Sequence, residues 1–192
     1  QAKVHRLAWL SVVSEKGAAP SLDNFVQGMA ALDYVLGKNL LIDARYGNNS
    51  RDALDRLALE AAALKPAVFV THGPAIGAAR KAHGDIPVVF GFSGDPAELG
   101  VVQSLARPGG RFTGVTFLAY ELSAKRVELV REILPGAKRI AVVSRPSHAG
   151  DRKEFQATHD AATKFGLAVT HHPAENPAEL ERALAGVASE RP

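Results

Sequence analysis

The chain has 192 residues, of which 46% are hydrophobic and 22% are charged, and its 23 basic and 20 acidic side chains give a formal net charge of +3. This composition is typical of a soluble globular protein and excludes long disordered segments and a coiled coil. No apolar stretch approaches the roughly 18 residues that a membrane-spanning helix needs. The scattered basic residues argue against a nucleic-acid-binding face, and the lack of cysteine excludes disulfides and zinc-thiolate sites.

The first part of the chain alternates short apolar runs with segments of helical periodicity. The apolar runs predict strands over residues 5–13, 39–45, 67–71, 86–92 and 112–117. Ser21, which follows Pro20, is a good N-cap and predicts a helix that Gly37 and Lys38 end. Further helices are expected over residues 51–64, 74–82 and 97–105.

The same alternation continues to the last residues. It predicts strands over residues 139–144 and 167–171 and helices over residues 121–134, 151–165 and 177–188. Strands that alternate with helices of this length indicate parallel βαβ units, so we expect the α/β class, with open parallel sheets and helices on both faces. The order that starts at His5 recurs from Arg139. This weak repeat suggests two lobes, of which the second is incomplete in this chain.

The loops after the strands are the candidate binding sites, because ligands of open α/β sheets bind outside the carboxyl ends of the strands. Several of these loops place small or polar residues where free backbone N–H groups suit a carboxylate or a phosphate. Taken singly, each loop could equally reflect turn and capping chemistry. The candidate positions are Ser14, Thr71, His72, Gly73, Ser93, Gly94, Asp95, Arg145, Ser147 and His148.

Some of these positions have two possible roles. His72 could donate to an anionic ligand or fill the turn beside Gly73. Asp95 could accept from a ligand ammonium group or cap its own helix, and capping is the commoner role. The neighbouring His171 and His172 point to opposite faces of their predicted strand, so we expect no metal pair there.

Motifs of known enzyme classes are largely missing. Neither a GxGxxG dinucleotide fingerprint nor a GxxxxGK[ST] phosphate loop occurs in the sequence. Residues 91–95 (GFSGD) resemble the GxSxG nucleophile elbow, with Asp95 in place of the final glycine. A hydrolase that uses Ser93 is therefore an alternative to a binding protein.

Several motifs follow one another in a specific order along nearly the whole chain. The most recognisable are residues 86–90 (IPVVF) followed by 94–96 (GDP), and residues 104–110 (SLARPGG) followed by 113–115 (TGV). Residues 25–28, 34–40, 64–66, 71–75 and 122–126 continue the match. In this order, the motifs resemble the substrate-binding proteins of bacterial ABC transporters, in the family that includes tryptophan- and tyrosine-type binding components.

The resemblance implies a type I periplasmic-binding-protein fold, in which two α/β lobes are joined by hinge strands and the ligand binds in the cleft between them. The lobes would be residues 1–116 and 117–192. Phe117 would join the candidates of the first lobe or the hinge, and Arg145, Ser147 and His148 would come from the second lobe. Family members are longer than this chain. They also usually carry Asn-Pro where this chain has Arg145-Pro146, and an arginine there can hold a ligand carboxylate.

We therefore expect the extracytoplasmic solute-binding component of an ABC importer, a monomer without catalysis, cofactor or metal. Its ligand would be a small amino-acid-like or aromatic carboxylate, and its partner a membrane permease, not nucleic acid. A periplasmic location would mean that the leader is absent from this chain. The alternatives are a cytosolic ligand-sensing domain of the same fold, a hydrolase using Ser93, and a remnant that binds nothing.

Overall fold

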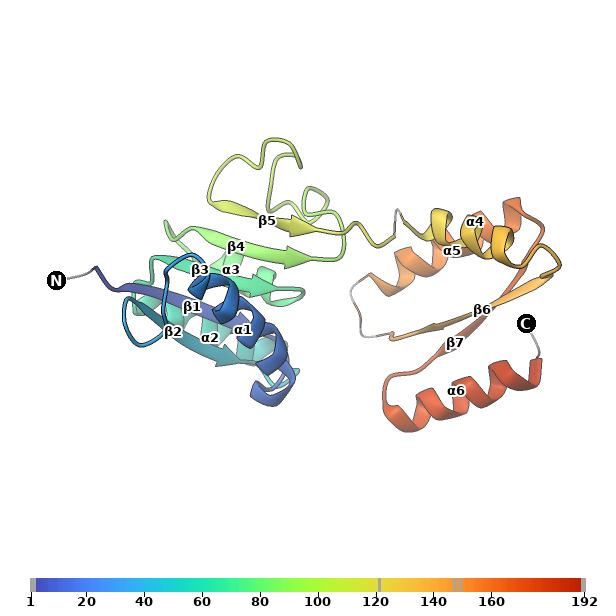
Figure 1. The fold of residues 1–192 in the computed structure, drawn as a ribbon, viewed down its shortest axis with the longest axis horizontal. Coiled ribbons are helices and arrows are strands. Elements are labelled where there is room, and N and C mark those ends of the chain that lie inside the picture. Colours follow the sequence, from blue (N-terminus) through green and yellow to red (C-terminus); the bar gives the residue numbers. More distant parts are fainter. Residues whose placement is uncertain (1–2, 121, 147, 149, 191–192) are drawn as a thin grey trace. The chain divides into compact units, whose positions relative to one another are not determined.

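The chain forms two compact units, Gln1–Thr116 and Phe117–Pro192, which we name unit 1 and unit 2 (Figure 1). The computed structural model describes residues 3–120, 122–146, 148 and 150–190. Within these residues, no helix combines the length and the apolar character that crossing a membrane requires.

Unit 1 is built around a parallel sheet of five strands in the order β2-β1-β3-β4-β5. The strands are β1 (His5–Ser11), β2 (Leu40–Tyr46), β3 (Val68–His72), β4 (Val88–Phe92) and β5 (Phe112–Thr116). Every neighbouring pair is parallel, and Trp9 of β1 lies between Ala44 of β2 and Val70 of β3. The sheet confirms the predicted α/β class.

Helices cover both faces of this sheet (Figure 1). They are α1 (Glu15–Ala30) on one face, and α2 (Arg51–Ala63) and α3 (Ala75–Ala82) on the other. Because side chains alternate along a strand, Leu10 of β1 faces α2, whereas Trp9 faces α1. The ring centroid of Trp9 lies 5.4 Å from that of Phe25 in α1.

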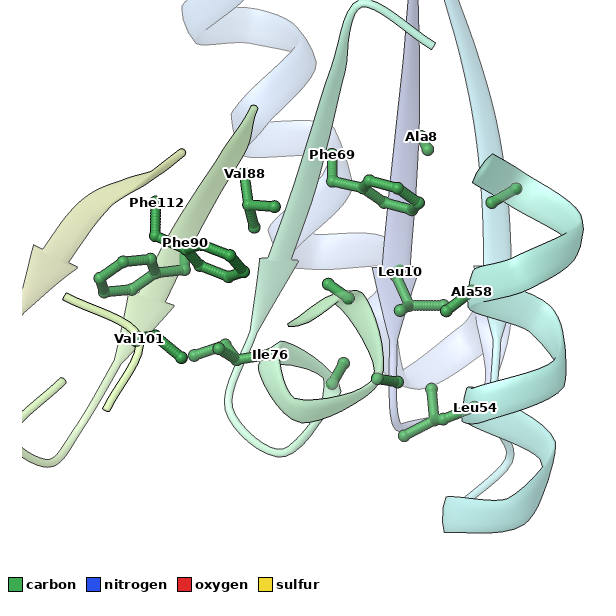
Figure 2. Close-up of a cluster of buried hydrophobic side chains, with 14 of the residues drawn as sticks. Ala8, Leu10, Leu54, Ala58, Phe69, Ile76, Val88, Phe90, Val101 and Phe112 are labelled. Carbon is green, nitrogen blue, oxygen red and sulfur yellow. The ribbon is translucent and has the colours of Figure 1, made fainter. Parts of the chain in front are cut away.

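The main core of unit 1 lies between the sheet and helices α2 and α3 (Figure 2). Leu10, Phe69 and Val88 contribute from the strands, and Leu54 and Ile76 from the helices; all five side chains are fully buried. Burial of one such side chain stabilises the fold by about 1.5–3 kcal/mol. This packed layer holds the strand ends, and the loops that follow them, in fixed places.

The start of α1 differs from the prediction. The helix begins at Glu15, with Ser14 as its N-cap, and Ser21 lies inside it. The Ser14 hydroxyl accepts a hydrogen bond from the Gly17 N–H at 3.3 Å. Ala18, near the start of this helix, is buried, so packing favours a helix that begins before Ser21. Pro20 then sits within the helix, where it cannot donate to a carbonyl of the preceding turn.

The helix predicted over residues 97–105 is wrong, because this segment forms turns and bends. A single turn follows Pro96, whose carbonyl accepts from the Val101 N–H at 3.2 Å. Gly100 then adopts a φ of +70°, which ends the turn. The apolar residues Val101 and Val102 of this segment enter the core of unit 1.

Unit 2 has a two-stranded parallel sheet covered by helices on both faces (Figure 1). Its elements are α4 (Ser123–Ile133), β6 (Arg139–Ser144), α5 (Asp151–Lys164), β7 (Ala168–Pro173) and α6 (Pro177–Glu190). Val127 of α4 and Ala162 of α5 pack with Leu167 in a small core on one face, and α6 covers the other face. Asn176 caps α6 by accepting from the Glu179 N–H at 3.0 Å.

The two neighbouring histidines of β7 contact different helices. The ring of His171 stacks on that of Phe155 in α5, with centroids 4.1 Å apart. The Nε2 atom of His172 lies 3.4 Å from Glu190 Oε2 in α6. The two side chains therefore lie on opposite faces of the strand, as the alternation predicts. Among the described side chains, no group of three or more possible ligands is placed to hold a metal ion.

Candidate ligand-binding sites

The loops that follow the strands of unit 1 meet at one edge of the sheet, because all five strands are parallel. After β1 the chain moves to β2 on one side, and it later returns to β3 on the other side of β1. In open α/β sheets such a reversal leaves a crevice at the carboxyl ends of the two strands, where ligands bind. The residues at this point are Ser11, which ends β1, and His72, which ends β3.

His72 lies at the reversal in a partly buried setting. Its Nε2 atom is 3.3 Å from the Ser11 hydroxyl oxygen, and its ring centroid is 5.9 Å from that of Trp9. Burial lowers the pKa of His72 below its ordinary value, so the ring is neutral at pH 7. A neutral imidazole offers a hydrogen bond to a ligand at this edge, but no positive charge.

Thr71 and Gly73, on either side of His72, are engaged within unit 1. The Thr71 side chain is 2% exposed, and its hydroxyl donates to the Leu10 carbonyl at 3.1 Å. The Gly73 N–H donates to the Gly91 carbonyl at 3.0 Å, and Gly73 has a φ of +54°. These two residues thus shape the turn that presents His72.

The loop after β4 is held by its own hydrogen bonds. Asp95 Oδ1 accepts from the Ala97 N–H at 2.7 Å, so of its two expected roles the structure shows the cap. The Gly94 carbonyl accepts from the Thr116 hydroxyl at 2.6 Å, which ties this loop to the end of β5. No helix follows Ser93 within residues 94–105, so the strand–turn–helix context of a nucleophile elbow is missing.

Two further predicted positions of the chain are exposed. Ser14 caps α1 with its hydroxyl. Phe117 is the first residue of unit 2 and is 63% exposed.

Unit 2 contains a cavity of about 440 Å³ at the carboxyl end of β6. Strand β6 and the loop after it form one wall, and helices α4 and α5 form the others. The lining residues are Ser123, Arg126, Val142, Val143, Ser144, Arg145, His148, Asp151, Glu154, Phe155 and Thr158. The structure therefore brings Arg145 and His148 together at one cavity, while Ser147 lies outside the described residues.

The predicted ligand-binding arginine already has a partner. Arg145 Nε donates to Glu175 Oε1 at 3.1 Å, and the two side chains are 59% and 41% exposed. His148 Nδ1 accepts from the Gly150 N–H at 3.2 Å and lies 3.8 Å from Glu154 Oε1.

Sequence reasoning missed the contribution of α4 and α5 to this cavity. Asp151, Glu154 and Phe155 lie in the first turns of α5, and Arg126 lies in α4. Ligands that bind beyond the carboxyl ends of strands can contact the first turn of the next helix as well as the loop before it. That signal could have pointed to Asp151 and Glu154; no comparable signal pointed to Arg126.

The family described as ABC transporter substrate binding protein matches residues 6–191. A tyrosine-binding protein of Clostridioides difficile is 28% identical over 181 residues, which are 91% of this chain and 52% of the relative. The chain thus spans about half the length of this relative.

Solved structures show the same fold. A conserved domain protein from Vibrio cholerae is 27% identical, with a TM-score of 0.81 over 98% of this chain and 63% of the other. A domain from Streptococcus pneumonia in complex with L-Trp is 22% identical, with a TM-score of 0.75 over 97% of this chain and 63% of the other. These likenesses confirm the resemblance drawn from the motifs. The chain is a member of the ABC transporter substrate-binding protein family.

Proposed function

We propose that this protein is the solute-binding component of an ABC importer, and that its ligand is a small amino-acid-like or aromatic carboxylate. Family membership supports the role in transport. One relative is a tyrosine-binding protein and another was solved in complex with L-Trp, which supports the ligand class. In this role the protein binds and releases its ligand without a catalytic step, outside the cytoplasm and as a monomer, and delivers it to a membrane permease.

The observation that carries the ligand class is the cavity at the end of β6. Its volume of about 440 Å³ falls in the range of roughly 300–1,000 Å³ that is usual for small-molecule sites. It combines two arginines, Arg126 and Arg145, with the aromatic side chain of Phe155. A guanidinium group matches a carboxylate in two-pronged fashion, and an aromatic wall suits an aromatic ligand.

The strand ends of unit 1 would supply further contacts. His72 offers a neutral ring nitrogen beside Ser11. Further ligand contacts are proposed for Ser14, Ser93, Gly94 and Phe117. Thr71, Gly73 and Asp95 would act by holding these loops in shape, since their polar groups bond within unit 1.

The test is a thermal-shift screen of the 192-residue chain against amino acids, aromatic carboxylates, nucleosides and sugars, followed by calorimetric titration of each hit. A ligand at 100 times its Kd stabilises the folded state by about 2.7 kcal/mol, which raises the Tm by several degrees. We expect shifts from the amino acids or the aromatic carboxylates. Shifts from sugars or nucleosides alone would overturn the ligand class, and a panel without any shift would overturn the binding role of this chain.

A matched pair of variants tests the carboxylate contact. Arg145→Gln is expected to weaken the binding of carboxylate hits at least about tenfold, because charge-assisted hydrogen bonds contribute roughly 1.5–3 kcal/mol. Arg152→Gln removes the same charge from an exposed position of α5 outside the cavity lining, and its Kd should match that of the wild type.

A further inference from the structure

We propose that His171, which lies behind the cavity at the end of β6, is a positioning residue: its hydrogen bond to Ser144 makes the Ser144 hydroxyl donate to the ligand carboxylate. This inference rests on the proposed function and adds a residue that is not part of the described cavity lining. It starts from two contacts of the His171 ring, each with a residue that does line the cavity.

The first contact is a hydrogen bond between His171 and Ser144. Strands β6 and β7 are parallel, and His171 lies opposite Val142 in their register. Ser144 is two residues beyond Val142, so its side chain points to the same face of the sheet. The Nε2 atom of His171 lies 2.8 Å from the Ser144 hydroxyl oxygen, which is a hydrogen-bond distance. Ser144 lines the cavity, so His171 can act on a ligand through this hydroxyl.

The second contact is a ring stack that limits how the imidazole can turn. The rings of His171 and Phe155 lie with their centroids 4.1 Å apart and their planes at 19°. Phe155 belongs to α5 and lines the same cavity. The stack fixes the plane of the imidazole, and the hydrogen bond fixes which ring edge faces Ser144. A single histidine thus supports two walls of the cavity.

The hydrogen bond decides what the Ser144 hydroxyl can offer to a ligand. A hydroxyl has one O–H donor and also accepts, and a neutral imidazole has one N–H donor and one acceptor nitrogen. If Nε2 of His171 carries the proton, it donates to Ser144, and the Ser144 O–H is left to donate to the ligand. An imidazolium, which donates from both nitrogens, has the same effect. If only Nδ1 carries a proton, the Ser144 O–H donates to Nε2, and the cavity meets an acceptor instead.

A ligand carboxylate selects the arrangement in which Ser144 donates, because a carboxylate only accepts hydrogen bonds. Arg145 follows Ser144 in the chain and lines the same cavity. A carboxylate has two oxygens, so one can accept from the Arg145 guanidinium group and the other from Ser144. A hydrogen bond to an ionised acceptor is stronger than one between neutral groups. The relay from His171 through Ser144 therefore strengthens carboxylate binding without contact between His171 and the ligand.

Calorimetric titration of the 192-residue chain and its variants tests the relay, with L-tyrosine and 3-(4-hydroxyphenyl)propionate as carboxylate probes. His171→Phe keeps a ring that can stack on Phe155 but loses the hydrogen bond, and should weaken binding about three- to tenfold. His171→Gln brings an amide N–H in place of Nε2–H and should restore most of the affinity. His172→Phe makes the same change on the opposite face of β7 and should leave the Kd unchanged.

The outcomes separate this proposal from the proposed function. If His171→Phe binds the probes as tightly as the wild type, the relay is wrong and the proposed function stands. If His171→Phe keeps its affinity while His171→Gln loses it, the histidine acts through its stack on Phe155 and not through Ser144. A wild-type chain that binds neither probe would contradict the relay and the proposed ligand class alike.

A double-mutant cycle distinguishes the relay from a general structural role of His171. Ser144→Ala removes the hydroxyl that would touch the ligand, and should weaken binding at least as much as His171→Phe does. In the Ser144→Ala background, His171→Phe should have no further effect, because the relay is already interrupted. Losses that multiply in the double variant would show that His171 acts by another route and would overturn the proposal.

Nuclear magnetic resonance of the chain with ¹⁵N-labelled histidine locates the proton without relying on affinity. The ¹⁵N signals of an imidazole distinguish a ring nitrogen that carries a proton from one that does not. With either probe bound, we expect a proton on Nε2 of His171. An unprotonated Nε2 in the bound state would mean that Ser144 donates to the histidine, and would overturn the proposal. His172 is the internal control, since its Nε2 contacts Thr170 and Glu190.

Discussion

The Nε2 atom of His72 and the hydroxyl oxygen of Ser11 lie 3.3 Å apart, where the neighbouring strands β1 and β3 end. The contact joins residues that are 61 positions apart in the sequence. It lies beside the Trp9 ring and marks the point at which the strand order of unit 1 reverses. Burial of the imidazole makes this contact sensitive to pH.

The pH dependence of stability should reveal the buried histidine. Burial holds the pKa of His72 below its ordinary value of 6.5, so below pH 6.5 the unfolded chain takes up a proton that the folded chain resists. The contribution of His72 is therefore fully present above pH 6.5 and is lost as the pH falls through the lowered pKa. The free energy of unfolding of the wild type, measured with urea, should fall between pH 7.5 and 5. In His72→Gln it should fall less steeply with pH. Equal slopes would show that His72 is not the responsible group.

Glycine at position 114 is required by the close approach of β4 and β5. A Cβ atom added there would overlap the Phe90 carbonyl oxygen and lie 2.8 Å from the Phe90 ring. Gly114→Ala should therefore lower the free energy of unfolding by about 1–3 kcal/mol, as overpacking does. Gly28→Ala is the matched control in α1, with no atom within 4 Å of the added Cβ. It should stabilise the protein by about 0.5–1 kcal/mol, because alanine favours a helix over glycine. Chemical denaturation measures both, and a neutral Gly114→Ala would contradict the packing argument.

The core between the sheet and α3 depends on Phe69. This side chain is fully buried, so Phe69→Ala should cost about 3–5 kcal/mol of stability by loss of burial and creation of a cavity. Leu59→Ala removes an apolar side chain that is 60% exposed on α2, and should cost well under 1 kcal/mol. The measurement is urea unfolding followed by circular dichroism. Similar losses for the two variants would place the core elsewhere.

The cap of α1 can be tested by comparing two serines. Ser14→Ala removes the hydroxyl that accepts from the Gly17 N–H and should cost about 1 kcal/mol. Ser21→Ala lies inside the helix, where alanine is the better helix former, and should be neutral or slightly stabilising. Thermal unfolding of both variants decides between the two positions. The opposite order of stabilities would restore Ser21 as the start of the helix.

The sheet of unit 1 could be predicted because its strands are short apolar runs separated by helices, a pattern that has few alternatives. The start of α1 could not be predicted in the same way, since both Ser14 and Ser21 are suitable caps. The choice depends on the burial of Ala18, which is a tertiary effect. The helix predicted over residues 97–105 was wrong for a related reason. The spacing of Val101 and Val102 reflects their place in the core, and the left-handed Gly100 prevents a helix.

The positions of the candidate residues in the fold could be predicted better than their hydrogen-bond and ion-pair partners. Parallel strands bring the loops after β1, β3 and β4 to one edge of the sheet, whatever those loops contain. Partners such as Leu10 for Thr71 and Glu175 for Arg145 lie far away in the sequence, so that no local pattern reveals them. Which of these side chains contacts the ligand stays a prediction.

The ion pair between Arg145 and Glu175 affects how an anion could bind at the cavity beyond β6. Ion pairs as exposed as this one contribute only about 0–1 kcal/mol, so little free energy is needed to separate the two side chains. Glu175 nevertheless holds the guanidinium group in a defined place beside the cavity. If Arg145 binds the ligand carboxylate as proposed, Glu175 would take the place of that carboxylate beforehand: it would keep the arginine preorganised and could be exchanged for the ligand at small cost.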